Sequence, residues 1–435
     1  MRDALRILLL LLCCCMRLVL LKSVEAFVKN TDTVPIAPPP PTLKIIFSDI
    51  DGSLIHYPSK QKQKTQLQKL NDNNNNNYNK KNSEDQILEL PPSATGLKGI
   101  ISSKTLETCR DLRQFKKGIK LVLVTGARTS TLLNRLPYLP KADVYCTEAG
   151  GRIFYPIEID DDDDDEFQNQ NQKQFIYTPL EYKGAQPEDL IPFGLREDQE
   201  WRTQMELGGA GKEGYVGNEI TSNRCSDKDY EDEEVEECLI DYENTEGFPL
   251  VEDEIPACDR KGKLWEYANH LVKQEGFVLD TKSYSTCFRV NKKHQQQQQQ
   301  QMNKGSPSTN TNTITNKFDA LLKGDIQHPE TTIGKSVNLG CIDFYPTSSG
   351  KGNCCRYIAN QLGIQLATES VCICDDDNDI EMALACGHSY IPSLSSTTMI
   401  KTLEGKNSTF TQTFGTGIAM TAATDVALDL IYNLP

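Results

Sequence analysis

The sequence LKIIFSDIDGS, residues 43–53, joins a short apolar run to a pair of aspartates. Residues 43–47 are apolar except for Lys44, and such a run predicts a buried β-strand. Asp49 and Asp51 follow almost at once, and a glycine comes directly after them. We therefore expect this strand to deliver two carboxylates to one edge of a sheet.

The same arrangement recurs at two later points in the chain. Residues 120–124 (KLVLV) predict a second buried strand, which is followed directly by Thr125 and Gly126. Residues 371–374 (VCIC) predict a third strand, which is followed by the run DDDND at residues 375–379. Each predicted strand therefore ends beside side chains that can bind a ligand.

Helical patterns lie between these strands. Residues 105–115 place apolar side chains at three-residue steps, and residues 352–362 carry one apolar face. Strands that alternate with helices predict an α/β fold with a doubly wound parallel sheet. In such a sheet the carboxyl ends of the strands share one edge, where ligands bind. We therefore expect Asp49, Asp51, Thr125 and Asp375 to converge on one crevice.

The acidic residues at this edge suit phosphoryl transfer. Asp49, Asp375 and Asp379 offer the hard oxygen ligands that Mg²⁺ prefers. One aspartate can attack phosphorus to form an aspartyl-phosphate, and a second, two residues on, can handle the leaving-group proton. Phosphoryl transfer needs mainly positioning and charge neutralisation, and this set of residues supplies both.

Groups that can bind a phosphate come from two other places. Thr125 supplies a hydroxyl, and Gly126 leaves room for a phosphate to approach backbone N–H groups. Lys351 opens the helix predicted near Gly352, and a helix start that carries a lysine favours an anion. We therefore predict that Thr125, Gly126 and Lys351 bind the substrate.

These motifs and their order resemble the haloacid-dehalogenase (HAD) superfamily of phosphatases. That family shows D-x-D-G-[TS], then [TS]-G, then a lysine, then G-D-x-x-N-D. The resemblance implies that Asp49 is the nucleophile and Asp51 the general acid/base. It also implies that Thr125 and Lys351 are catalytic and hold the phosphoryl group. The Mg²⁺ ligands that it implies are Asp49, Asp51 through its carbonyl, and Asp375, supported by Asn378 and Asp379.

Two residues depart from the family's motifs. Ser53 stands where threonine is commoner, and it keeps the hydroxyl. Cys374 replaces the usual glycine before Asp375. Both side chains are small, so we expect the site to be retained.

The resemblance further implies a large α/β cap domain inserted in the core. It divides the chain into core residues 42–151, a cap over residues 152–345, and core residues 346–435. Within the cap, residues 287–290 predict one strand, and residues 339–344 predict a strand that returns to the core. A helical stripe is formed by Leu264, Ala268, Leu271 and Val272, with Trp265 on its flank. This arrangement resembles the subgroup that contains sucrose-phosphate phosphatase, phosphomannomutase and the Cof-type sugar-phosphate phosphatases.

Two features of the insertion bear on the substrate. The sequence EAGGR at residues 148–152 resembles a Glu-Asn-Gly-Ala stretch near the substrate in that subgroup, although Ala149 lacks the amide. Arg289, in a predicted cap strand, is the candidate for binding a substrate anion or hydroxyl. The alternative is a solvated arginine on the face of that strand.

The charge of the chain is concentrated in a few segments. The 435 residues have a net charge of −15, which disfavours a nucleic-acid partner. Residues 160–166 and 227–237 contribute −7 each, which leaves −1 for the rest and is compatible with a small phosphoester substrate. Both tracts fall in polar stretches that cannot bury enough apolar area to fold. The predicted polar insertions are Ser59–Glu84, Asp160–Gln174, Ser226–Glu237 and Lys292–Asn316.

Residues 1–41 are predicted to be a targeting presequence. An apolar run at residues 7–16 and the small-residue motif at 24–26 predict a cleaved signal peptide, with an uncleaved anchor as the alternative. Phe27 and the residues after it resemble the bipartite plastid presequence of algae with secondary plastids. We therefore expect a protein of the chloroplast stroma, without a membrane segment after processing; the alternative is the secretory pathway. Imaging of residues 1–45 fused to a fluorescent protein distinguishes the two.

The predicted function is Mg²⁺-dependent hydrolysis of a small phosphorylated metabolite through an aspartyl-phosphate. A sugar phosphate is the favoured substrate class. One alternative is a phosphomutase or phosphotransferase on the same scaffold. The other is a catalytically silent protein that binds a phosphorylated metabolite. The motifs predict no oligomeric state.

Overall fold

The computed structural model describes residues 43–58, 86–92, 98–115, 118–156, 176–177, 190–191, 194–211, 219–221, 257–292, 295, 312–324, 326, 332–338, 340–394, 396–404, 409–415 and 418–434. The presequence expected at residues 1–41 and both acidic tracts lie outside these residues. Within the described ranges, no helix has the length and apolarity needed to cross a membrane.

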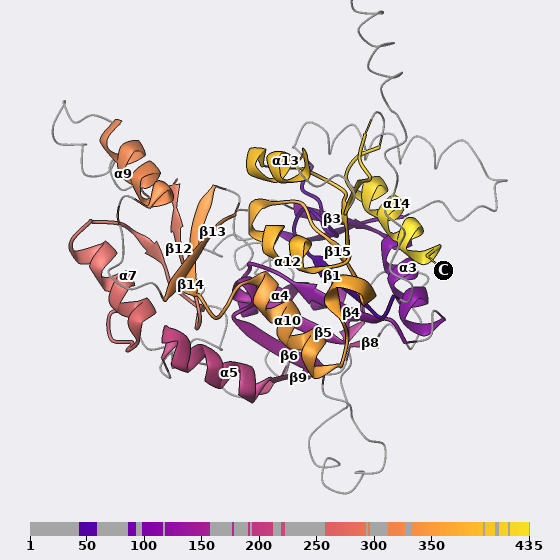
Figure 1. Ribbon diagram of the computed structural model, residues 1–435, viewed down its shortest axis with the longest axis horizontal. Coiled ribbons are helices and arrows are strands. Elements are labelled where there is room, and N and C mark those ends of the chain that lie inside the picture. Colours follow the sequence, from indigo (N-terminus) through magenta and orange to yellow (C-terminus); the bar gives the residue numbers. More distant parts are fainter. Residues whose placement is uncertain are drawn as a thin grey trace, which may run out of the picture.

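The larger part of the fold is a nine-stranded sheet in the order β10-β9-β6-β5-β4-β1-β15-β16-β17 (Figure 1). The six strands from β5 to β17 in this order are parallel, and β6, β9 and β10 extend the sheet in antiparallel fashion. The strands are β1 (Ile45–Asp49), β4 (Lys120–Val124), β5 (Val144–Thr147), β6 (Arg152–Pro156), β9 (Gly194–Glu197), β10 (Glu219–Thr221), β15 (Ser370–Ile373), β16 (His388–Ile391) and β17 (Phe410–Gln412).

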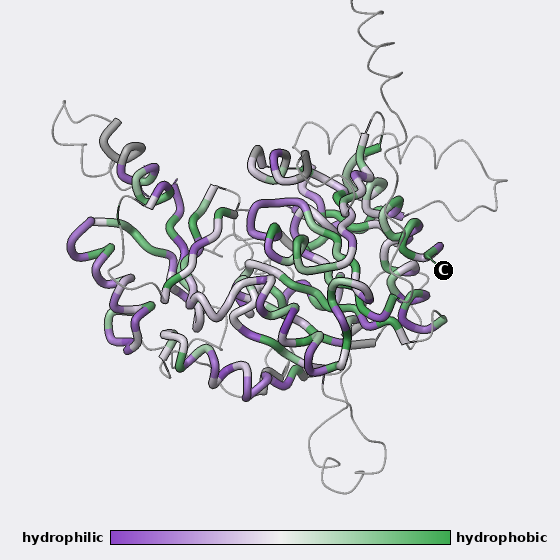
Figure 2. The backbone as a smooth tube through the Cα atoms, in the orientation of Figure 1, coloured by the Kyte–Doolittle hydropathy of each residue, from purple (hydrophilic) through white to green (hydrophobic). Residues whose placement is uncertain are grey.

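Helices cover both faces of this sheet. The side chain of Ile46 belongs to one hydrophobic core, and those of Ile45 and Phe47 belong to the other, because successive strand residues point to opposite faces. Helices α3 and α14 pack in the first core, and α5, α10 and α12 in the second. Apolar residues accordingly line the central strands in Figure 2. The predicted doubly wound α/β fold is confirmed.

The remaining elements of this part are short. The helices are α3 (Ser103–Gln114), α4 (Thr129–Arg135), α5 (Gln199–Met205), α10 (Lys351–Gln361), α11 (Leu366–Glu369), α12 (Ile380–Ala385), α13 (Thr397–Glu404) and α14 (Thr421–Tyr432). Helical turns are η1 (Leu136–Tyr138), η2 (Glu148–Gly150), η4 (Glu206–Ala210) and η7 (Asp377–Asp379). Two hairpins are formed by β2 (Ile87–Pro92) with β3 (Lys98–Ser102), and by β7 (Ile176–Tyr177) with β8 (Leu190–Ile191).

The apolar patterns located the central elements well. Strand β4 coincides with the predicted residues 120–124, and α10 begins one residue before the predicted helix. Strand β1 is displaced toward the aspartates, since Asp49 still pairs with Val124 in the neighbouring strand. The nucleophile candidate is therefore the last residue of a strand, where backbone pairing holds it.

A second, smaller sheet of four antiparallel strands has the order β11-β12-β14-β13, with α7 and α9 beside it (Figure 1). Its elements are α7 (Lys263–Lys273), β11 (Leu279–Asp280), β12 (Phe288–Asn291), α9 (Asn312–Lys323), β13 (Ile333–Asn338) and β14 (Cys341–Pro346). The predicted stripe of α7 needs one correction: Val272 is 46% exposed, whereas Tyr267 is buried together with the predicted Trp265. The large rings pack against the sheet because they contribute the most apolar area.

The boundary expected between core and cap at residue 152 is wrong. Residues 152–156 form β6, which pairs with β5, and β9 and β10 continue the same sheet. The described part of the smaller unit instead begins at residue 257 and ends with β14. Antiparallel strands that extend a parallel sheet leave no break in the apolar pattern at which a boundary can be placed.

The polar stretch predicted as an insertion at Lys292–Asn316 is partly ordered. Asn312 begins α9, so the last residues of that stretch are helical. Gln295 is buried: its side-chain amide donates to the carbonyl of Val278 and accepts from the N–H of the same residue. A buried amide that satisfies both groups of one backbone unit behaves as part of the core, whatever the composition around it.

His56 is the buried histidine of the hairpin region, and it has a consequence for stability. Its Nε2 lies 2.7 Å from Oγ1 of Thr424, and burial lowers its pKa from 6.5 to about 4. Between pH 6.5 and 4, the His56 side chain is therefore protonated in the unfolded chain and neutral in the folded chain. We expect this residue to remove about 3 kcal/mol of unfolding free energy as the pH falls through that window.

Denaturant unfolding at several pH values checks this expectation. The variant His56→Gln keeps a group that can bond to Thr424 but does not titrate. The loss of unfolding free energy between pH 6.5 and 4 is expected to be smaller in the variant. Parallel curves for the two proteins would contradict the assignment.

Candidate functional site

The turn after β1 brings the first and last motifs into contact. Asp49 ends the strand and is 4% exposed. The chain then turns at Gly52, whose φ of +93° favours glycine. A Cβ at Gly52 would lie 2.0 Å from Oδ2 of Asp375, so a larger residue would push the two loops apart. Oγ of Ser53 donates to Oδ1 of Asp375 at 3.1 Å, which uses the hydroxyl kept at this position.

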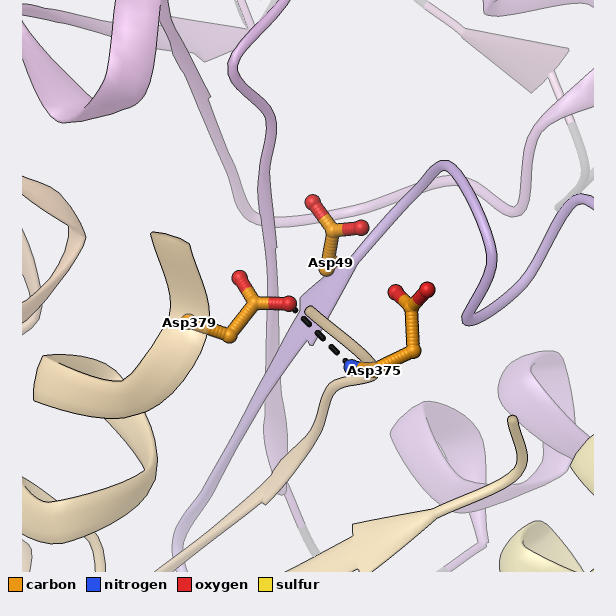
Figure 3. A group of neighbouring side chains, drawn as sticks. All are labelled: Asp49, Asp375 and Asp379. Carbon is orange, nitrogen blue, oxygen red and sulfur yellow. Dashed lines mark hydrogen bonds between the residues drawn. The ribbon is translucent and has the colours of Figure 1, made fainter. Parts of the chain in front are cut away.

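Parallel pairing gathers the carboxylates at one edge of the sheet. Asp49 pairs with Val124 on one side, and β15 flanks β1 on the other, so the loops after β4 and β15 begin beside Asp49. Carboxylate oxygens of Asp49, Asp375 and Asp379 lie within 4.8 Å of one another, and all three residues are buried (Figure 3). Residues more than 300 positions apart thus form one acidic group.

Lys351 is the cation of this group. It is the first residue of α10 and is 2% exposed. Its Nζ donates to Oδ1 of Asp49 at 2.5 Å and to Oδ1 of Asp379 at 2.6 Å. Burial alone lowers the pKa of this lysine, but the two carboxylates outweigh burial and raise it, so the ammonium stays charged. Lys351 therefore bridges the two motifs that the sequence places farthest apart.

Asp379 also shapes the loop that precedes it. Its Oδ2 accepts from the backbone N–H of Asp375 at 3.2 Å and of Asp376 at 3.3 Å, as the dashed line in Figure 3 shows for the first. Asp376 returns a capping contact to the same turn. Asn378 lies in the middle of this turn, η7, and its supporting role stays a prediction. The DDDND run is therefore a loop that is held by hydrogen bonds among its own residues, with Asp375 at its start.

The charges of the acidic group are unequal among the described residues. Three carboxylates face one ammonium, and burial is the largest factor that raises the pKa of Asp49 and Asp375. Neighbouring carboxylates raise both pKa values further, and Lys351 only partly opposes them. A hard divalent cation at this place would relieve the repulsion, and carboxylate oxygens are its preferred ligands. These residues therefore fit a metal ion.

The second motif lies beside this group in a structured turn. Thr125 directly follows β4 and is 2% exposed. Its Oγ1 accepts from the N–H of Ala127 at 3.0 Å, and its own N–H bonds to the carbonyl of Cys146. Among the described residues, no acceptor takes the hydroxyl proton of Thr125, so this hydroxyl can donate to a ligand. The predicted roles of Thr125 and Gly126 are compatible with this geometry and stay predictions.

Arg289 does not lie free as the sequence led us to expect. Its guanidinium forms two hydrogen bonds with Asp343, at 2.6 and 2.8 Å, and Nη2 also reaches the carbonyl of Gly126 at 3.5 Å. Strand pairing sets Arg289 opposite Asp343, which is buried. Arg289 is therefore not a freely solvated residue, because its charge is matched within the protein, and its role in substrate binding stays a prediction. An aspartate within the apolar strand CIDFYP was the signal that sequence reasoning missed.

Glu148 joins the two sheets. It is fully buried, and its Oε2 accepts from the N–H groups of Ser285 and Thr286 and from Oγ1 of Thr286, at 2.7 to 2.8 Å. Ala149, the departure from the related Glu-Asn-Gly-Ala stretch, has a φ of +56°, a conformation that asparagine tolerates better than alanine. The stretch therefore anchors residues of the smaller unit to the core at a charged, desolvated contact.

Asp51, the predicted general acid/base, stands outside the acidic group of three. Its Oδ1 accepts from Nη1 of Arg135 at 2.6 Å and from the hydroxyl of Tyr57. Sequence reasoning assigned no role to Arg135 or Tyr57. Nothing in the sequence around Arg135 pointed to this contact, because Arg135 lies 84 positions from Asp51.

One family model matches part of this chain. Residues 260–392 match the family model described as haloacid dehalogenase-like hydrolase, a range that contains Lys351 and the DDDND loop. A search of the curated proteins found no match.

The solved structures that are similar to this chain include the following three. One is the sucrose-phosphatase from Synechocystis sp. in complex with sucrose and phosphate, with 12% identity over 90% of this chain and 98% of that one, and a TM-score of 0.38. Another is a haloacid dehalogenase-like hydrolase protein from Bacillus subtilis, with 12% identity over 94% and 99%, and a TM-score of 0.37. The third is a phosphatase of the haloalkanoate superfamily from Bacteroides thetaiotaomicron, with 11% identity over 91% and 96%, and a TM-score of 0.40.

The family match contains the last two of the four ordered motifs, and the fold brings the carboxylates of the first and last motifs to one edge of a doubly wound sheet. Residues 260–392, which include the lysine of the buried Asp-Lys-Asp contact at that edge, are therefore similar to the haloacid dehalogenase-like hydrolases.

Proposed function

We propose that this protein is a Mg²⁺-dependent phosphatase of a small phosphorylated metabolite, with a sugar phosphate as the favoured class. The observation that carries the proposal is the contact of Lys351 with Asp49 and Asp379, beside Asp375 and Thr125. It combines a buried carboxylate nucleophile, a fixed cation and a metal-binding arrangement. These are the elements that phosphoryl transfer requires.

In the first half of the proposed reaction, a carboxylate oxygen of Asp49 attacks phosphorus. An acyl-phosphate bond forms as the bond between phosphorus and the ester oxygen breaks. The ester oxygen takes the proton of the Asp51 carboxyl group and leaves as an alcohol. Lys351 and Thr125 hold the phosphoryl oxygens during this transfer.

In the second half, a water molecule attacks the phosphorus of the aspartyl-phosphate. The carboxylate of Asp51 takes a proton from that water, and the acyl-phosphate bond breaks to release phosphate and restore Asp49. Asp49, Asp375 and Asp379 would hold the metal ion, with Asn378 and the Asp51 carbonyl as further proposed contacts. When bound, Mg²⁺ supplies positive charge that neutralises phosphoryl oxygens.

The position of the smaller sheet beside the loop after Thr125 favours a small substrate. Arg289 of β12 reaches the carbonyl of Gly126, and Thr286 is bonded to Glu148, so the cap is in contact with the loop after Thr125. A substrate whose phosphate lies near Thr125 would have its remainder close to the cap. The sucrose and phosphate in the sucrose-phosphatase structure make sugar phosphates the first compounds to test.

Phosphate release from a panel of sugar phosphates, with and without Mg²⁺, tests the proposal. We expect turnover of at least one compound that depends on Mg²⁺, and its loss in Asp375→Asn, because that variant removes a charged ligand. Product analysis with a second sugar present distinguishes hydrolysis from phosphoryl transfer. Tight binding of phosphoesters without any turnover would favour the catalytically silent alternative.

A further inference from the structure

Three side chains close a ring of hydrogen bonds at the edge of the acidic site. Nη1 of Arg135 donates to Oδ1 of Asp51 at 2.6 Å, and Nη2 of the same guanidinium donates to the hydroxyl of Tyr57 at 2.7 Å. That hydroxyl in turn donates to the same Oδ1 of Asp51. Asp51 is therefore held by two donors, and each donor also fixes the other.

We propose that Arg135 and Tyr57 are positioning residues that orient the carboxyl group of Asp51 for proton transfer to the leaving group. This inference rests on the phosphatase function proposed above. It adds two residues that the motifs do not contain.

The ring is built into the fold and is not a chance contact between surface side chains. Arg135 is the last residue of α4 and is 6% exposed. The aromatic side chain of Tyr57 packs closely over Gly99, where an added Cβ would lie 3.3 Å from Cε1 of Tyr57. The hydroxyl of Tyr57 accepts from Arg135 and donates to Asp51, so both of its hydrogen bonds lie within this group.

The arrangement leaves one oxygen of Asp51 for chemistry. Both donors converge on Oδ1, and within the described residues Oδ2 has no hydrogen-bond partner. The Asp51 side chain keeps 21% of its surface exposed, whereas that of Arg135 keeps 7%. A carboxyl group pinned at one oxygen and open at the other can exchange a proton only at the open oxygen. The ring therefore sets where the proton of the leaving group is delivered.

Leaving groups of different basicity separate this role from a structural one. An alkyl phosphate, such as a sugar phosphate, needs a proton on its leaving oxygen, whereas p-nitrophenyl phosphate releases a stable phenolate that does not. The ratio kcat/KM reports the steps up to release of the leaving group, so it is the constant to compare. In Tyr57→Phe, we expect kcat/KM for the alkyl phosphate to fall by about 10- to 100-fold, through kcat rather than KM. For p-nitrophenyl phosphate we expect a fall of no more than about threefold.

Two further variants sharpen the measurement. Arg135→Lys keeps the charge but loses the two-pronged contact, and we expect the same selective loss for the alkyl phosphate. Tyr145→Phe is the matched control, because Tyr145 belongs to the core against which Tyr57 packs, but its hydroxyl accepts from the N–H of Ala142. In this control, kcat/KM should stay unchanged for both the alkyl phosphate and p-nitrophenyl phosphate.

The outcomes distinguish this inference from the proposed function. If the wild type releases phosphate from neither substrate, the phosphatase proposal itself fails. If the wild type is active and Tyr57→Phe lowers kcat/KM equally for both substrates, the phosphatase stands and the positioning role is overturned. Combining Tyr57→Phe with Asp51→Asn should cost nothing beyond Asp51→Asn alone for the alkyl phosphate, and an additive loss would also contradict the role.

Discussion

Replacement of Asp49 with asparagine is expected to reduce phosphate release to background, a loss of at least about 10⁴-fold in kcat. The neutral amide is a poor nucleophile and cannot form the acyl-phosphate through which the proposed reaction proceeds. The fold should survive the change, because Lys351 keeps its contact with Asp379. Phosphate release by the purified variant, on the best substrate of the wild type, is the measurement.

A surface aspartate provides the control for this variant. Asp429 pairs with Lys104 on the exterior, and Asp429→Asn should retain the activity of the wild type. An Asp49→Asn protein that folds and keeps more than about a tenth of the wild-type rate would remove Asp49 as the nucleophile.

The second large effect concerns Lys351, whose replacement by methionine should destabilise the protein as well as inactivate it. The change leaves Asp49 and Asp379 buried without their cation, and breaking a buried ion pair in this way costs about 3–5 kcal/mol. For a core of this size the melting temperature should fall by about 10 °C. Thermal unfolding without added Mg²⁺ measures the effect, because a metal ion would mask part of it.

An exposed pair shows what the same substitution does without burial. In the pair of Lys104 with Asp429, the side chains are 34% and 47% exposed, and such pairs contribute about 0–1 kcal/mol. Lys104→Met should therefore leave the melting temperature nearly unchanged. Equal shifts for the two lysine variants would mean that Lys351 is not the bridging cation that its contacts indicate.

Local patterns were sufficient for the elements that build the sheet edge. Residues 120–124 form β4 as predicted, since a short apolar run between polar residues is stable only when both of its faces are buried. The position of Asp49 after such a run placed it at a carboxyl end, where the parallel pairing with Val124 holds it. The convergence of Asp49 and Asp375 followed from topology alone.

Local sequence patterns were insufficient in two situations. One is a strand that extends an existing sheet, and the other is a residue of a polar stretch that becomes buried. The strand β6 was assigned to the cap, because its residues look the same whether they extend one sheet or begin another. Gln295 was assigned to a polar insertion, but its amide meets the backbone of Val278 and is buried. Composition describes an average over a segment, whereas burial is decided residue by residue.

The sequence by itself determined the doubly wound sheet, the order of the motifs and the chemistry at the strand ends, because periodicity and side-chain type are local properties. Only the tertiary structure decided which charges meet. Arg289 pairs with Asp343 across 54 positions, and Arg135 pairs with Asp51 across 84. Such contacts depend on strand register and on the ends of helices, and a charged side chain carries no local mark of its distant partner. The partners of the predicted active-site residues therefore became visible only in the folded chain.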